Sequence, residues 1–143
     1  TGADRPASVA GPFATIALHA STPRNGALVL EIEVDDNAAY TLCRPVGELD
    51  AYTVTDFRET LGELATHPRV VIDLSEVPFM DSAGLGALIG GIRRAREHGG
   101  EVAVACSRPT LTRLLHTTGF DRIVPVTETL DDAVSAVADG QEP

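Results

Sequence analysis

The chain has 143 residues, of which 43% are hydrophobic, and its mean hydropathy is +0.06. This length supports one domain with a hydrophobic core and is too short for two ordinary domains. The 11 Arg residues and the 21 Asp and Glu residues give a net charge of −10, and the sequence contains no Lys. Such an acidic chain repels phosphate backbones and anionic lipids, so we expect no direct nucleic-acid binding and no membrane binding.

Residues 1–26 differ in composition from the rest of the chain, because Ala, Pro, Gly, Ser and Thr dominate them and no hydrophobic period runs through them. Such a segment buries little apolar surface. It therefore predicts a flexible N-terminal arm that is compatible with a short ordered piece near Phe13–Leu18. The periodic part of the sequence predicts one domain over residues 27–140.

Hydrophobic spacing in this domain changes between the two-residue period of strands and the 3.6-residue period of helices. Pro125 cannot donate a hydrogen bond to a ladder, which makes 123–126 a short edge strand. The predicted elements, in chain order, are strands over 28–34 and 40–46 joined by a turn at 35–37, a helix over 52–66, a strand over 70–74, a helix over 83–97 that Gly99-Gly100 end, a strand over 101–106, a helix around Leu111–Leu115 that Gly119 closes, the edge strand, and a helix from Leu130 to Val137 that Gly140 ends.

This order of elements indicates the fold class. Strands that alternate with helices after residue 40 predict an α/β sandwich with a mixed, mostly parallel sheet of about five strands and about four helices. The first two strands are joined by a short turn, so we expect that pair to be antiparallel.

Two loops follow the second and third predicted strands, Gly47–Asp50 and Met80–Gly86. A strand–helix–strand connection makes its two strands parallel, so their carboxyl ends lie at one edge of the sheet. We therefore expect the two loops to lie side by side, at the edge where ligands usually meet open α/β sheets.

Ser82 directly precedes the predicted helix over 83–97, and this position favours a role as its N-cap. Gly84 and Gly86 fall in the first helical turn, where each costs roughly 1 kcal/mol relative to Ala. Either the close approach of another backbone or tight packing of the helix on the sheet would compensate for that cost. The setting makes Ser82 a candidate for function as well as for capping.

The sequence argues against catalytic, metal and cofactor sites. Cys43 and Cys106 stand among apolar residues without a CxxC or Cys/His cluster, so we expect reduced core thiols and no metal. Gly84, Gly86 and Gly90 miss the dinucleotide fingerprint by one residue, and a phosphate-binding loop would need a Lys that the chain lacks. The serine nucleophile elbow lacks its first Gly. We therefore expect no enzyme and no cofactor.

Four stretches carry a family resemblance: Gly47-Glu-Leu-Asp50, Val71-Ile-Asp-Leu-Ser75, Met80-Asp-Ser-Ala-Gly-Leu-Gly86 and Leu130-Asp-Asp-Ala-Val134. Over about residues 28–138 the sequence resembles a STAS domain, and more narrowly a bacterial anti-sigma factor antagonist. The Asp-Ser-Ala-Gly-Leu-Gly stretch is the specific part of this match. The arm at 1–26 is longer than a minimal domain of this type needs, and it could be an expression remnant, the dimerisation segment of a homodimer or a regulatory extension.

The resemblance implies a cytoplasmic binding protein. Its partner would be an anti-sigma factor that is also a serine kinase, and binding this partner would release a sigma factor for transcription. The kinase would phosphorylate Ser82 and so inactivate the antagonist, and a PP2C-type phosphatase would reverse the reaction. The family pattern places Asp50 nearest the serine, where it would orient it, whereas sequence alone equally allows a cap for the helix over 52–66. The expected partner-binding residues are Glu48, Asp50, Asp81, Ser82, Ala83, Gly84, Leu85 and Gly86.

A phosphate at Ser82 would add about −1.5 to −2 charges. A helix N-terminus accepts this charge within the molecule, whereas an interface packed against Ser82 and acidic neighbours would be repelled without any refolding. Two alternatives stay open. One is a non-switching STAS module of a stressosome or lipid-transport complex. The other is a small enzyme or nucleotide-binding protein that uses the glycine-rich turn.

Overall fold

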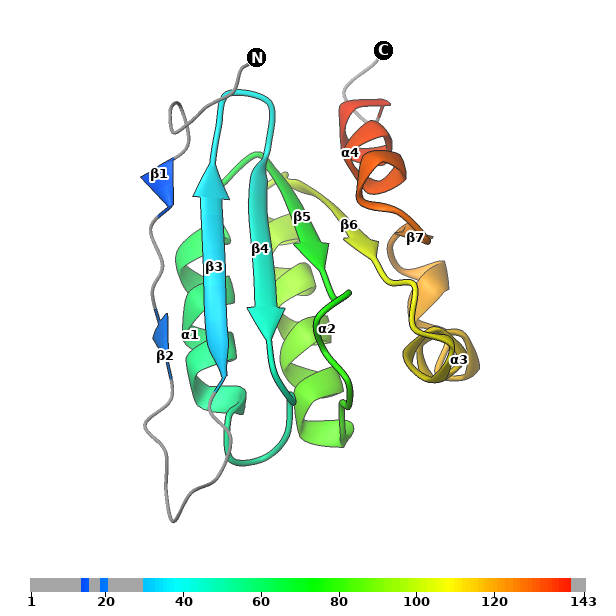
Figure 1. Ribbon diagram of the computed structural model, residues 1–143. Coiled ribbons are helices and arrows are strands. Elements are labelled where there is room, and N and C mark those ends of the chain that lie inside the picture. The colour runs from blue at the N-terminus through cyan, green and yellow to red at the C-terminus, as the bar shows by residue number, and fades with distance from the viewer. Residues whose placement is uncertain (1–13, 16–18, 21–29, 140–143) are drawn as a thin grey trace.

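A computed structural model describes residues 14–15, 19–20 and 30–139. They form one mixed sheet in the order β1-β3-β4-β5-β6-β7, with β2 also paired to β3 (Figure 1). The strands are β1 (Ala14–Thr15), β2 (His19–Ala20), β3 (Glu31–Asp36), β4 (Thr41–Val46), β5 (Arg69–Asp73), β6 (Glu101–Ala105) and β7 (Val126–Thr127). The helices are α1 (Val54–Leu64), α2 (Ser82–Glu97), α3 (Pro109–Thr117) and α4 (Leu130–Asp139), with a 3-10 turn, η1, at Phe120–Arg122.

The sheet has the predicted mixture of directions. Strands β3 and β4 are antiparallel, and each of the pairs β4–β5, β5–β6 and β6–β7 is parallel. The five strands from β3 to β7 and the four α-helices confirm the predicted fold class. Strands β1 and β2 add two short antiparallel pairings to β3, and both come from the segment predicted as an N-terminal arm. The remaining residues of 1–26 lie outside the described part of the chain.

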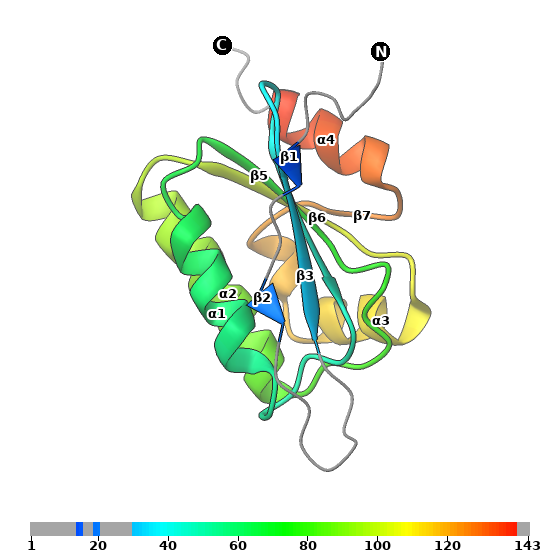
Figure 2. The same cartoon turned by 60° about the vertical axis from the view of Figure 1, so that its left-hand side comes forward.

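Helices cover the two faces of the sheet unequally. Helices α1 and α2 lie side by side on one face, and α4 lies on the other (Figure 2). Alternation along the strands divides the core accordingly: Cys43, Ile72 and Val104 face α1 and α2, whereas Leu42 and Val71 belong to the cluster beneath α4. Both cysteines are free and buried, as predicted.

The sheet face over β3 and β4 that is turned toward the viewer in Figure 1 carries no helix among the described residues. Three of its side chains, Glu33, Arg44 and Asp73, form a charged network. The Arg44 guanidinium donates through Nε to Asp73 Oδ2 at 3.1 Å and through Nη1 to Glu33 Oε1 at 3.2 Å. Asp73 is buried, and its other carboxylate oxygen accepts the Ser75 N–H at 3.0 Å. The buried Asp73 carboxylate therefore has hydrogen-bond partners at both oxygens, as burial of a charge requires.

Element boundaries differ from the sequence expectation in a few places. Asp35 and Asp36, predicted in the turn at 35–37, extend β3, because both pair with β4 across the ladder. The predicted strand over 123–126 is wrong for its first three residues. Gly119 takes a left-handed conformation (φ +79°) that leads into η1, and the strand begins only at Val126. The predicted helix end at Gly140 lies outside the described residues.

Candidate functional site

The two loops predicted to share the sheet edge are hydrogen-bonded to one another. The Leu49 N–H donates to the Phe79 carbonyl at 3.0 Å, and the Asp81 N–H donates to the Leu49 carbonyl at 3.1 Å. Leu49 and Met80 form an isolated parallel bridge, and both side chains are buried. The loop after β4 is therefore fixed to the segment that enters α2.

The loop after β4 begins with a glycine, Gly47. Gly47 directly follows β4 and has a φ of 128°, which lies in a region that side-chain-bearing residues rarely adopt. This conformation turns the chain out of the strand, and the Gly47 N–H donates to the Glu76 carbonyl at 3.1 Å. The loop thus begins and ends on the β5–α2 connection.

Asp81 joins the two loops through its side chain. Its Oδ1 accepts the Gly84 N–H at 3.0 Å, which makes Asp81 the N-cap of α2. Its Oδ2 accepts the Ala51 N–H at 3.2 Å, at the end of the other loop. The sequence-based assignment of Ser82 as the N-cap is therefore wrong. Ser82 is the first residue of the helix, because the longer Asp81 side chain reaches the helix N–H from one position earlier.

Ser82 is exposed, directly beside this junction. In the part of the chain that the structure describes, the backbone N–H groups of Ser82 and Ala83 have no hydrogen-bond acceptor. Such free N–H groups carry the positive end of the helix dipole, so an anion on the Ser82 hydroxyl would meet favourable charge from its own helix. The site combines an exposed serine with a backbone that the Asp81 side chain holds by two hydrogen bonds.

The two glycines of the first turn have different surroundings. A Cβ on Gly84 would lie 2.5 Å from the Leu49 carbonyl oxygen, 2.9 Å from Leu49 Cβ and 3.0 Å from Met80 Cγ. Gly84 is therefore required by the close approach of another backbone, one of the two explanations considered from the sequence. A Cβ on Gly86 would meet nothing within 4 Å, so packing does not require a glycine there.

Asp50 caps the turn that leads into α1. Its Oδ1 accepts the N–H groups of Tyr52 at 2.9 Å and Thr53 at 3.2 Å, and the Thr53 hydroxyl donates to the Glu48 carbonyl at 2.7 Å. Among the described residues no hydrogen bond joins Asp50 to Ser82. Of the two roles considered for Asp50, the structure supports capping.

Two large apolar side chains near Ser82 were missed by the sequence analysis. Tyr52 is 86% exposed and Phe79 is 49% exposed, and they lie on the two bonded loops. Tyr52 falls inside the predicted helix over 52–66, and an aromatic residue in a predicted amphipathic helix is normally assigned to its apolar, buried face. Phe79 is next to Met80, whose side chain is buried. Exposed aromatic residues of this kind are typical anchors of protein interfaces.

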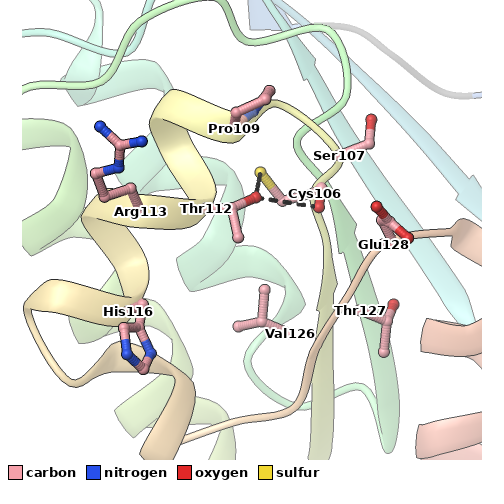
Figure 3. A pocket seen from close by; sticks show the side chains of 9 residues that line it. All are labelled: Cys106, Ser107, Pro109, Thr112, Arg113, His116, Val126, Thr127 and Glu128. Atoms are coloured by element: carbon pink, nitrogen blue, oxygen red, sulfur yellow. Dashed lines mark hydrogen bonds between the residues drawn. The ribbon is translucent and has the colours of Figure 1, made fainter.

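A depression of about 590 Å³ lies at the same sheet edge, between α3 and β7 (Figure 3). Arg113 and His116 of α3 line one wall and Glu128 the other, and Cys106 lies at its base. None of the eight predicted partner-binding residues lines it. The described residues hold no group of three or more His, Cys, Asp or Glu side chains that could bind a metal ion, and no described helix is long and apolar enough to cross a bilayer.

Comparisons with known proteins identify the family to which the fold that carries this site belongs. A model of the STAS domain matches residues 30–133. The chain belongs to the STAS domain family. The family assignment made from the four sequence stretches is thereby confirmed.

Several known proteins resemble this chain along most of their own length. The anti-sigma F factor antagonist of Paenibacillus polymyxa is 32% identical over 113 residues, which cover 77% of this chain and 94% of the relative. The anti-sigma-B factor antagonist of Bacillus subtilis is 30% identical over 98 residues, 68% of this chain and 90% of the relative. The crystal structure of an anti-sigma factor antagonist from Mycobacterium paratuberculosis superposes with a TM-score of 0.72 at 32% identity, covering 77% of this chain and 95% of that one.

Proposed function

We propose that this STAS domain is an anti-sigma factor antagonist that phosphorylation of Ser82 switches off. In the cytoplasm it binds an anti-sigma factor that is also a serine kinase, and the bound kinase releases a sigma factor. The kinase transfers the ATP γ-phosphoryl group to the Ser82 hydroxyl, and a PP2C-type phosphatase removes it. Relatives that carry the name of antagonist cover most of this chain, which supports the general role.

The position of Ser82 is the single observation that carries the proposal. Its hydroxyl is exposed at the first residue of α2, and the backbone beneath it is held by the Asp81 side chain. A kinase can reach such a hydroxyl without unfolding any part of the domain. The chain itself needs no catalytic group, since the phosphoryl donor and the base would belong to the kinase.

Charge gives the phosphate its effect on binding. A phosphoserine adds about −1.5 to −2 charges to a surface that already contains Glu48, Asp50 and Asp81. The unpaired N–H groups of Ser82 and Ala83 stabilise this charge in the free protein. A partner packed over Tyr52 and Phe79 would have to desolvate it, which costs several kcal/mol unless an opposite charge pairs with it. Binding is therefore lost while the fold stays intact.

The experiment first identifies the partner. Immobilised wild-type protein and Ser82→Asp are exposed to a lysate of the source organism, and proteins retained by the wild type alone are identified by mass spectrometry. The proposal requires an anti-sigma factor with a serine-kinase domain among them. If Ser82→Asp retains the same anti-sigma factor, the domain is a non-switching STAS module.

The second step tests the chemistry. The purified anti-sigma factor and ATP are incubated with wild-type protein, with Ser82→Ala, and with the matched control Ser107→Ala, whose serine is exposed just before α3. We expect one phosphoryl group on the wild type and on Ser107→Ala, and none on Ser82→Ala. A PP2C-type phosphatase should restore binding of the phosphorylated protein. Phosphate on another residue would contradict the proposal.

A further inference from the structure

A second surface feature lies on α2 itself, toward the end opposite Ser82. It is a groove of about 370 Å³ between the last turns of α2 and the residue that follows η1, Ile123. Ile123 is 39% exposed, and Ile89 is half-buried. The groove is lined by Ile89, Ile92, Arg93, Arg96, Glu97 and Ile123.

The two groove arginines have no charged partner among the described residues. Within the described ranges, no hydrogen bond or ion pair joins Arg93 or Arg96 to another side chain. Arg94, between them, turns instead toward α1, where its Nη2 lies 4.0 Å from the place that a Cβ on Gly62 would occupy. In a chain with a net charge of −10, two guanidinium groups against one carboxylate make this groove a local positive site.

The groove lies on the same side of α2 as Ser82. Positions 82, 86, 89 and 93 follow the i, i+4, i+7 and i+11 spacing that places side chains along one helix face. Eleven residues of helix separate Ser82 from Arg93, about 16 Å. A standard protein interface covers about 800 Å² of each partner, a patch roughly 30 Å across. One partner docked over Ser82 is therefore large enough to reach the groove.

We propose that the anti-sigma factor which covers Ser82 also seats in this groove a segment with an apolar side chain flanked by Asp or Glu residues. The inference rests on the proposed function and adds a second contact to it. The apolar side chain packs between Ile89 and Ile123, and the carboxylates pair with Arg93 and Arg96, whose planar guanidinium groups suit carboxylate oxygens. The net positive charge of the groove favours such a segment over a basic one.

The test measures the affinity of the purified anti-sigma factor for charge-reversed variants, by calorimetry at low and at high salt. Arg93→Glu/Arg96→Glu should weaken binding at least about tenfold at low salt, and the loss should shrink as salt screens the charges. Ile123→Ser should weaken binding about fivefold with little dependence on salt. The control is Arg113→Glu, which carries the same change of charge as each single variant, Arg93→Glu or Arg96→Glu. It alters an arginine of the depression between α3 and β7 (Figure 3) and should bind like the wild type, whereas each single groove variant should bind more weakly.

Other outcomes would overturn the inference. If Arg93→Glu/Arg96→Glu binds within about twofold of the wild type while Ser82→Asp does not bind, the groove proposal fails and the proposed function stands. Equal losses in the single variants Arg93→Glu, Arg96→Glu and Arg113→Glu would show an effect of total charge only and would refute the groove proposal. A groove variant that changes the oligomeric state by light scattering, with unchanged anti-sigma binding, would assign the groove to a second copy of this chain. A wild type that retains no anti-sigma factor would refute both proposals.

Discussion

Replacing Gly84 tests the close contact between the Gly47–Asp50 loop and the start of α2. Gly86, in the same helical turn, is a matched control. Replacing either glycine by Ala gains the same helix propensity, up to about 1 kcal/mol. The two variants differ in the space that is available to the new methyl group. The new methyl group at 84 would lie 2.5 Å from the Leu49 carbonyl oxygen, whereas at 86 it would meet nothing within 4 Å.

The Leu49 carbonyl cannot move away freely. It accepts the Asp81 N–H at 3.1 Å, and the Leu49 N–H is held by the Phe79 carbonyl at 3.0 Å. Overpacking against such a fixed neighbour costs typically about 1–3 kcal/mol. We therefore expect Gly84→Ala to be about 1–3 kcal/mol less stable than Gly86→Ala, equivalent to roughly 3–10 °C in melting temperature. Gly86→Ala should be as stable as the wild type or more so.

Urea unfolding followed by far-UV circular dichroism measures this difference directly. Equal denaturant slopes for the wild type and both variants would show that all three proteins expose the same surface area on unfolding, so that their midpoints can be compared. The reasoning is refuted if Gly84→Ala and Gly86→Ala have the same midpoint, since the approach of the Leu49 backbone would then impose no constraint.

Three further predictions concern other residues. Asp81→Ala should lower the free energy of unfolding by about 1–2 kcal/mol in urea titrations, because two backbone N–H groups lose their acceptor. Burial raises the pKa of the Cys43 thiol from 9.0 to about 12. The neutral thiol therefore stabilises the fold fully below pH 9, and this contribution is lost as the pH rises toward 12, so stability should fall less steeply over that range in Cys43→Ala than in the wild type. Tyr52→Ala should weaken anti-sigma binding at least about fivefold in calorimetry, with a melting temperature close to the wild type, because its side chain is 86% exposed.

The parts of the fold that the sequence predicted well are those with long hydrophobic periods. The strands from β4 to β6 and the four helices follow from that periodicity alone. The side-by-side placement of the two loops also followed, because parallel connections force it. The Leu49–Met80 bridge confirms this placement.

Predictions failed where two residues compete for one role or where an apolar run is buried without forming a strand. Asp81 and Ser82 are both good N-caps, and only the geometry shows that the carboxylate takes the cap. Val124 is 2% exposed in the turn after η1, so its burial in the core does not depend on a ladder. The exposure of Tyr52 could not be predicted, since a helix start presents each residue to solvent or core at an angle that the local sequence does not determine.

The hydrogen bond between Leu49 and Asp81 joins residues that are 32 positions apart in the chain, and α1 and β5 lie between them. The surface around Ser82 therefore exists only after the β4–α1–β5 unit has closed. An unfolded or newly synthesised chain contains the same residues without presenting them together. A partner that binds this surface therefore binds only correctly folded molecules. The concentration of binding-competent protein thus depends on the folding equilibrium of the domain.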